Sequence, residues 1–246
     1  MHEINICHLY PEHLNLYGDR GNILAIRRRA AWHGLKAKII VVHPGEQIDF
    51  NRCDLLFMGG GQDHEQKLVA GDLKGRRGEL LEAIDRGMVI LAICGSYQLL
   101  GSYYETSRGE HIAGLEILDL HTQAGRRRLT GNIVTRCDLW DPPRTLVGFE
   151  NHAGRTFLGT SLRPLGRVIR GHGNNGRDRT EGVVHRNVIG TYMHGSLLPK
   201  NPWLTDYLLE KALAYRGCKF TPQTLDETVE TRAHEAAIRF ARARRR

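Results

Sequence analysis

The chain has 246 residues, 41% of them hydrophobic and 25% charged, a composition typical of a soluble globular protein with a substantial core. No apolar run is long enough to span a bilayer, and the N-terminal segment does not have the form of a signal peptide. Five scattered cysteines without a CxxC pair argue against a disulfide framework and against a zinc site. We therefore expect a cytoplasmic protein without membrane insertion.

The net charge of +8 is concentrated near the C-terminus. Residues 232–246 hold six arginines and one glutamate, a local charge of +5, so the remaining 231 residues carry only +3. This distribution does not indicate a basic face for nucleic acid, and the motifs of RNA- and DNA-binding proteins are absent. We expect a basic helical extension at about 221–246, either solvated or docked on a partner protein.

Strands and helices alternate through the first 93 residues. Apolar runs predict strands at 4–9, 37–42, 55–58 and 88–93, and helices at 22–33 and 79–86. Such alternation indicates an α/β fold with a doubly wound, mostly parallel sheet and helices on both faces. The functional site of such a sheet lies beyond the carboxyl ends of its strands.

From about residue 112 the pattern changes to short strands separated by Gly, Asn, Asp and Pro, at 112–120, 129–136, 145–150, 166–170 and 183–185. We interpret these pieces as β-hairpins added to one edge of the core. A buried-type strand at 188–193 follows, and helices are predicted at 203–216 and from about 225. Neither an internal repeat nor a linker divides the chain, so we expect a single domain over 1–246.

Cys94 lies between the strand that ends at Ile93 and a helical pattern that begins at Gly95. A residue on such a sharp turn projects beyond the sheet, which is the geometry of a nucleophile elbow with a thiol in place of serine. The N-terminus of the helix favours the thiolate, the form that attacks. A buried structural cysteine is the alternative. The order strand, Cys, Gly and helix favours the nucleophile.

A thiolate nucleophile needs a proton shuttle, and histidine suits that task near neutral pH. His194 is the candidate because it follows a core strand at the same sheet edge, and His152 is the next candidate. The three glycines at 59–61 follow another strand and can present backbone N–H groups to a developing oxyanion. We predict an oxyanion hole formed by Gly60, Gly61 and Gly95. A structural histidine and a simple tight turn are the alternatives.

Together these segments resemble the class I glutamine amidotransferases. The resemblance rests on the glycines at 59–61, Ile93-Cys94-Gly95-Ser96-Tyr97-Gln98 and Tyr192-Met193-His194-Gly195. The chain is most similar to the branch that includes the cobyric-acid synthases, and within it to the glutaminase subunits of lipid II isoglutaminyl synthases. The segments that carry this finer similarity, within a resemblance that runs from about 3 to 240, are 14–22, 148–156 and 173–175.

The resemblance implies roles for individual residues. Cys94 matches the nucleophile and His194 the general base, and Gln98 matches a glutamine that helps to hold the substrate, L-glutamine. Arg128 matches an arginine that engages the substrate, although the adjacent arginines at 126–127 leave the register open. A surface arginine in a hairpin is the alternative for Arg128.

The sequence departs from the usual pattern of these enzymes at two places. Ala92 and Ser96 replace the glycines of Gly-x-Cys-x-Gly, which fits the cobyric-acid branch. Ser196 replaces the glutamate that usually follows the histidine by two positions, so the carboxylate that orients His194 is not where it is expected. The resemblance implies an acid supplied by a partner subunit, and the alternatives within this chain are Asp63, Glu65 and Glu150.

Released ammonia must be passed to an activated acceptor, and activation of a carboxylate normally needs ATP. The chain lacks the Gly-x-x-x-x-Gly-Lys-Ser/Thr loop, so we expect no cofactor in it. The resemblance implies a heterodimer with a Mur-ligase-like synthetase subunit. That partner would hold ATP and Mg²⁺ and amidate the α-carboxyl of D-glutamate in lipid II during peptidoglycan biosynthesis. A glutaminase for corrinoid amidation and a non-catalytic regulatory subunit are the alternatives.

Overall fold

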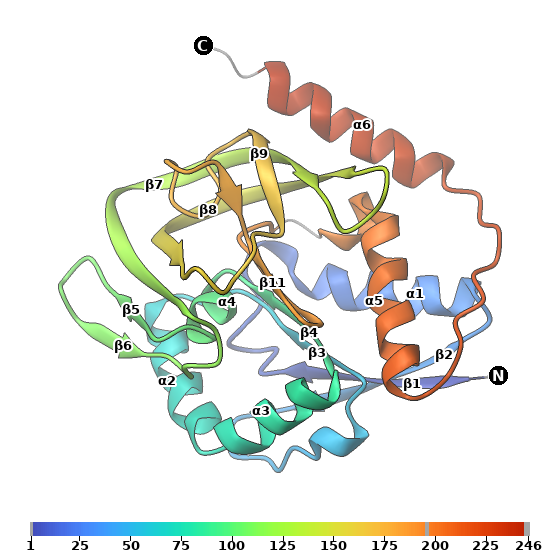
Figure 1. The fold of residues 1–246 in the computed structure, drawn as a ribbon, viewed down its shortest axis with the longest axis horizontal. Helices are drawn as coiled ribbons and strands as arrows, with labels where there is room; N and C mark the ends of the chain where they lie inside the picture. The colour runs from blue at the N-terminus through green and yellow to red at the C-terminus, as the bar shows by residue number, and fades with distance from the viewer. Residues whose placement is uncertain (1, 195–196, 244–246) are drawn as a thin grey trace.

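The computed structural model describes residues 2–194 and 197–243 (Figure 1). Its first sheet has six strands in the order β11-β12-β4-β3-β1-β2, and every neighbouring pair is parallel except β11 with β12. The strands are β1 (Glu3–Leu9), β2 (Lys36–Val42), β3 (Leu55–Met58), β4 (Val89–Ile93), β11 (Val183–His185) and β12 (Val188–Thr191). The chain therefore has the predicted doubly wound α/β fold.

Helices cover both faces of this sheet. α1 and α5 pack against each other on one face, and α2 and α3 lie on the other, below the strands in Figure 1. The helices are α1 (Arg20–Trp32), α2 (Asp63–Lys74), α3 (Arg77–Arg86), α4 (Gly95–Leu99) and α5 (Pro202–Tyr215), with short 3₁₀ turns at Leu16–Gly18, Phe50–Arg52 and Leu198–Lys200. The sequence analysis did not predict α2, because the polar Gln66 occupies part of its buried face beside Val69 and Leu73.

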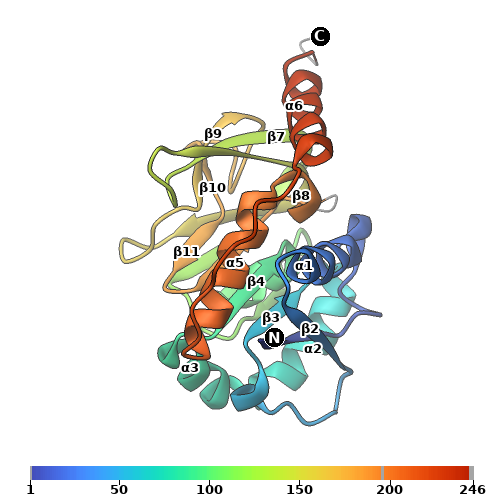
Figure 2. The ribbon, with the colours of Figure 1, turned by 90° about the vertical axis from the view of Figure 1, so that its right-hand side faces the viewer.

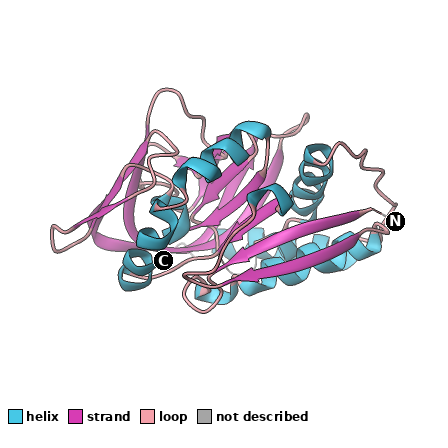
Figure 3. Ribbon diagram, turned by 90° about the horizontal axis from the view of Figure 1, so that it is seen from below, coloured by secondary structure: helices cyan, strands magenta, loops and turns pink. Residues whose placement is uncertain are grey.

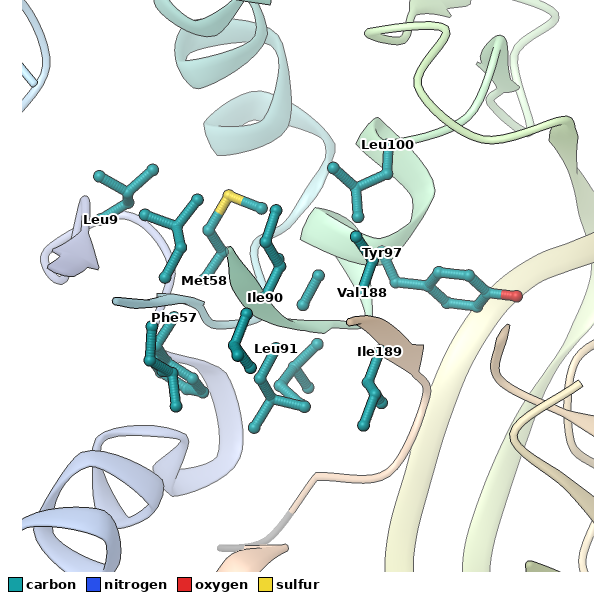
Figure 4. Packing of buried hydrophobic residues seen from close by; sticks show 14 of the residues in the cluster. Leu9, Phe57, Met58, Ile90, Leu91, Tyr97, Leu100, Val188 and Ile189 are labelled. Carbon is teal, nitrogen blue, oxygen red and sulfur yellow. The ribbon is translucent and has the colours of Figure 1, made fainter. Parts of the chain in front are cut away.

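The central strands are buried along their whole length. All four residues of β3 and all five of β4 are buried, as expected for parallel strands covered on both faces. Figure 4 shows the alternation: Met58 and Ile90 lie on one side of the strands, and Phe57 and Leu91 on the other. Burial of each such side chain contributes about 1.5–3 kcal/mol to the free energy of unfolding. The buried strands therefore hold the loops that follow them in fixed positions.

The strands predicted at 129–136, 145–150, 166–170 and 183–185 are present, whereas the one predicted at 112–120 is wrong over 114–119, which form no strand. Most of these strands form a second sheet rather than an extension of the first, which only β11 joins. The order of this second sheet is β10-β9-β7-β5-β6, with β8 paired to β7. Its strands are β5 (Tyr103–Glu105), β6 (His111–Ala113), β7 (Leu120–Cys137), β8 (Arg144–Leu158), β9 (Gly166–Arg170) and β10 (Thr180–Glu181). β8 alternates buried and less buried residues, so one face packs inward while its edge pairs with β7. The second sheet lies above the first in Figures 1 and 2.

The C-terminal helix α6 (Thr228–Ala243) packs on β7 and β8 (Figure 2). Its buried residue, His234, shares hydrogen bonds of 2.8 Å with the carbonyl oxygen of Lys200 and the hydroxyl of Thr145. The expected basic extension is therefore helical from residue 228, and residues 244–246 lie outside the described part. None of the described helices is long and apolar enough to cross a membrane. Figure 3 shows the chain from below, with its helices and strands distinguished by colour.

Candidate active site

Cys94 occupies a strained turn between β4 and α4. Its φ of 51° and ψ of −105° are unusual for a residue with a side chain, and such conformations cost about 1–3 kcal/mol. Two hydrogen bonds hold the turn: the Cys94 N–H donates to the carbonyl of Thr191 at 2.8 Å, and the Ser96 hydroxyl donates to the carbonyl of Gly59 at 2.5 Å. The turn has the predicted elbow geometry and places the thiol at the carboxyl edge of the sheet.

His194 follows β12 and is fixed at the same edge by the second sheet. Its backbone forms an antiparallel bridge with Phe149 of β8, with N···O distances of 2.7 and 3.2 Å. The imidazole is fully buried, and the ring of Tyr17 meets it edge-on with a centroid distance of 5.0 Å. The orientation of His194 therefore depends on backbone from the second sheet as well as on β12.

Asp19, which was not among the candidate acids, places a carboxylate beside His194. Both of its oxygens lie 3.2 Å from Nδ1 of His194, and its Oδ2 accepts the Gly60 N–H at 2.7 Å. The resemblance implies an acid from a partner subunit, but a fully buried carboxylate of the same chain occupies the position beside His194. Ser196, on which that expectation rested, lies outside the described residues.

The three acids proposed as alternatives lie elsewhere. Glu150 accepts hydrogen bonds from the ring and backbone N–H of His172 and from the Gly173 N–H. Asp63 and Glu65 lie in the first turn of α2, and neither contacts His194 through a hydrogen bond. Asp19 was not considered, because it lies 175 positions from His194 in a loop between β1 and α1.

The surroundings of His194 favour its charged form. Burial by itself lowers the pKa of His194, but the negative charge of Cys94 and the hydrogen bond to Asp19 outweigh it and raise the pKa to about 10. The Nε2 atom has no hydrogen-bond partner among the described residues. The ring therefore has Asp19 at Nδ1 and Cys94 beside it, an arrangement that suits proton transfer at Nε2.

The three glycines predicted to form the oxyanion hole have different roles in the structure. The Gly60 N–H is committed to Asp19, which corrects the prediction that it binds an oxyanion. A Cβ at Gly60 would lie 2.5 Å from Cε1 of His194, so the residue gives the imidazole its space. No hydrogen bond among the described residues uses the Gly61 N–H. Gly95 begins α4, where an N–H has no acceptor within the helix.

A cavity of about 420 Å³ lies in front of Cys94. Among its lining residues the only acidic or basic side chains, histidines apart, are Asp63 and Arg128. Arg128 lies at the rim, where its Nε and Nη2 donate to the side-chain and main-chain oxygens of Asn151, both at 2.8 Å. Arg126 and Arg127 line another cavity, so Arg128 is the one of these three arginines that lines the cavity in front of Cys94. The remaining lining residues are Leu16, Tyr17, Gly61, Gln62, His64, Gln66, Gln98, Tyr104, Ser107, Asn151, His152, Ala153 and Gly154.

Gln98 lies in the wall of the cavity, and its amide is largely engaged by other side chains. It accepts a hydrogen bond from Gln66 at 3.0 Å and donates one to the Tyr192 hydroxyl at 2.9 Å. His152 stacks on Tyr192 with a centroid distance of 3.6 Å, and its Nδ1 donates to the Gly154 carbonyl. Burial lowers the pKa of His152, so this histidine is neutral at pH 7. Sequence analysis missed the role of Gln66 because α2 itself was missed.

The described residues contain no group of three or more His, Cys, Asp or Glu side chains arranged to hold a metal ion. The chemistry that the arrangement can perform is that of a thiol, an imidazole backed by a carboxylate, and backbone N–H donors. These groups can attack a carbonyl carbon and move a proton to a leaving group.

This fold is that of the class I glutamine amidotransferases. The structure superposes on PurLQS from Thermotoga maritima with a TM-score of 0.61 and 17% identity, covering 87% of this chain and 99% of that one. A glutamine amidotransferase from Thermotoga maritima gives a TM-score of 0.57 and 17% identity, covering 99% and 96%. At these identities the likeness concerns the fold.

The sequence profile of CobB/CobQ-like glutamine amidotransferase domains matches residues 5–202, and the chain belongs to this family. It is 45% identical to subunit GatD of the lipid II isoglutaminyl synthase (glutamine-hydrolyzing) of Staphylococcus aureus strain N315, over 97% of this chain and 96% of that protein. The subunit of the same name from Streptococcus pneumoniae strain R6 is 40% identical, over 86% and 81%. The cobyric acid synthase of Streptococcus sanguinis is 32% identical, over 70% of this chain but only 34% of that protein.

Proposed function

We propose that this chain is the glutaminase subunit of a lipid II isoglutaminyl synthase. It hydrolyses L-glutamine at Cys94 and passes the ammonia to a separate ATP-dependent synthetase. The observation that carries the proposal is the placement of Cys94 on an elbow beside His194, whose Nδ1 faces the carboxylate of Asp19. The near full-length similarity to proteins of that name supports the choice of acceptor.

In the first half of the reaction the Cys94 thiolate attacks the carbon of the substrate's side-chain amide. The carbonyl oxygen becomes negatively charged, and the N–H groups of Gly61 and Gly95 stabilise it. The C–N bond then breaks as Nε2 of His194 gives its proton to the leaving nitrogen, which departs as ammonia. The product is a γ-glutamyl thioester on Cys94.

In the second half a water molecule attacks the carbonyl carbon of the thioester. Nε2 of His194 accepts a proton from this water, the C–S bond breaks, and glutamate leaves. The thiolate and the imidazolium are restored. Throughout the cycle Asp19 keeps the proton on Nδ1, so that Nε2 always faces the reacting atoms.

The charged side chains of the cavity match the α-carboxylate and α-ammonium groups of glutamine. Arg128 binds the α-carboxylate, because a planar guanidinium suits a carboxylate, and Asp63 binds the α-ammonium group. Both charges act on the phenol of Tyr104: burial and the nearby Asp63 and Cys94 raise the pKa of Tyr104 to about 12, while Arg128 lowers it. Asp63, Arg128 and Cys94 thus all lie near Tyr104. This arrangement suits glutamine, whose charged α-groups would contact Asp63 and Arg128 while Cys94 attacks its side-chain amide.

The synthetase reaction belongs to another polypeptide in this proposal. The sequence has no phosphate-binding loop, so ATP and Mg²⁺ would be held by a Mur-ligase-like partner in a cytoplasmic heterodimer. That partner activates the α-carboxyl of D-glutamate in lipid II, and the ammonia made here converts it to D-isoglutamine. The short match to cobyric acid synthase makes corrinoid amidation the second choice, because the chain spans only 34% of that protein.

The test is amidation of lipid II by the chain purified together with its synthetase partner. Wild-type complex should amidate lipid II in the presence of ATP with either glutamine or ammonium chloride as the nitrogen source. Cys94→Ser should lose the reaction with glutamine and keep the reaction with ammonium chloride, because only ammonia production depends on the thiol. Glutamine-dependent amidation by the Cys94→Ser complex, or amidation of a corrinoid acid but not of lipid II, would contradict the proposal.

A further inference from the structure

A bulge in β7 divides its three consecutive arginines between two cavities. The pairing with β8 shifts between Ala124 and Leu129, so residues 125–128 face only Ala153 on the partner strand. Arg128 at the end of the bulge lines the cavity in front of Cys94. Arg126 and Arg127 line a second cavity of about 780 Å³.

Arg155 fixes the shape of this bulge. Its guanidinium donates to the carbonyl oxygens of Arg127 at 2.6 Å and Ala153 at 2.8 Å. It lies directly over Gly125, where a Cβ would come within 2.6 Å of its Cζ atom. The arginines of the bulge are therefore held in a defined arrangement rather than on a free loop.

The second cavity, here called the arginine cavity, is lined by four arginines and by no carboxylate. Its lining consists of Gln123, Ala124, Gly125, Arg126, Arg127, Leu129, Arg155, Phe157, Asn175, Gly176 and Arg177. Within the described part of the chain, none of these four guanidinium groups takes part in an ion pair. The adjacent Asp178 is engaged elsewhere, because its carboxylate accepts from Asn175 at 2.6 Å and from Thr180 at 2.7 and 2.8 Å.

The positive charges of the cavity act on one another. Burial lowers the pKa of Arg155, and the charge of Arg177 lowers it further, while Tyr192 and Glu150 oppose this shift. Neighbouring guanidinium groups repel each other, and an anion bound between them relieves this repulsion. Arginine forks match phosphate oxygens with paired hydrogen bonds, and several such contacts need a group with several oxygens and more than one negative charge.

We propose that the arginine cavity binds a diphosphate group. Four cationic side chains from β7, β8 and the loop before β10 surround a space that is roomy enough for both phosphates. Two sources share this chemistry: a polyprenyl diphosphate, such as the anchor of the lipid-linked acceptor, or a free nucleoside diphosphate. Only the lipid source rests on the proposed function, since diphosphate binding itself requires no glutamine hydrolysis.

The first experiment is calorimetric titration of the full chain with inorganic pyrophosphate at low salt. The double variant Arg126→Ala/Arg177→Ala removes two exposed guanidinium groups that make no side-chain hydrogen bond within the described chain. We expect its Kd to rise at least about tenfold, since a charge-assisted hydrogen bond is lost at each site. The control Arg27→Ala/Arg167→Ala changes the net charge equally at exposed positions outside the cavity and should bind like wild type.

Both double variants should hydrolyse glutamine at the wild-type rate. Failure of the glutaminase proposal is a separate result, because it would appear as absence of glutamine hydrolysis in the wild-type protein. Absence of pyrophosphate binding to wild type, or equal weakening in the two double variants, would overturn the proposed site. The sources are separated with ADP and with vesicles that contain a polyprenyl diphosphate or an equal charge of phosphatidylglycerol. Binding to ADP alone identifies a nucleotide, and preference for polyprenyl diphosphate vesicles identifies the lipid. Equal binding to both kinds of vesicle, without binding to ADP, would overturn diphosphate recognition.

Discussion

Both carboxylate oxygens of Asp19 lie 3.2 Å from Nδ1 of His194, across 175 positions of the sequence. The same carboxylate accepts the Gly60 N–H, so one buried acid connects the loops that follow β1, β3 and β12. These loops meet because the strands end at the same edge of the parallel sheet. The site is therefore assembled from distant segments, and the carboxylate beside His194 comes from this chain.

Asp19→Asn should lower the pKa of His194. The Asp19 hydrogen bond and charge help to raise that pKa, so their loss leaves burial, which lowers it, less opposed. The imidazolium is the acid for the leaving ammonia, so turnover falls as pH rises through the pKa of His194, about 10 in wild type. We expect the alkaline limb of kcat/KM to move to lower pH by about one unit or more. An unchanged alkaline limb would show that Asp19 does not act on His194.

The isolated chain should hydrolyse glutamine without its synthetase partner. Its imidazole is already oriented by Asp19, so no acid from a second subunit is needed to fix the tautomer. We expect the rate of the chain alone, at saturating glutamine, to lie within about tenfold of the rate of the complex, less than the usual contribution of a general acid–base group. An inactive isolated chain that gains activity only in the complex would point to a missing catalytic group.

Gly60→Ala should damage catalysis more than folding. The new Cβ would lie 2.5 Å from Cε1 of His194, so the ring must move away from its position. We expect kcat to fall by about 10²-fold, the usual contribution of a general acid–base group. Gly71→Ala is the matched control, because a Cβ there meets nothing within 4 Å on the exposed face of α2. It should keep full activity and gain about 0.4–1 kcal/mol in stability.

Arg128→Ala should raise KM for glutamine with little change in kcat. The guanidinium lies at the rim of the cavity, far from the bonds that break, and its loss removes a charge-assisted contact worth roughly tenfold or more in affinity. Arg127→Ala is the control, since that side chain lines the arginine cavity instead. If Arg127→Ala raised KM and Arg128→Ala did not, the assignment of the substrate-binding arginine would be wrong.

The sequence could predict the features of the site that depend on residues adjacent along the chain. The buried run of β4, the glycine after Cys94 and the apolar spacing of α4 indicate the elbow directly. Asp19 could not be found in this way, because its partner lies at the other end of the chain and the loop after β1 has no periodic pattern. The length of β7 was also missed, since the polar bulge at 125–128 interrupts its alternation, and only its second part, 129–136, was predicted as a strand.

The most direct test of the account is detection of the γ-glutamyl thioester on Cys94. Wild-type protein mixed with glutamine would be quenched rapidly with acid and digested, and the peptide that contains Cys94 would be examined by mass spectrometry. We expect one γ-glutamyl group on Cys94 in wild type, and neither adduct nor glutamine hydrolysis in a folded Cys94→Ser variant. Steady glutamine hydrolysis by Cys94→Ser, or turnover in wild type without any adduct on Cys94, would contradict the central claim.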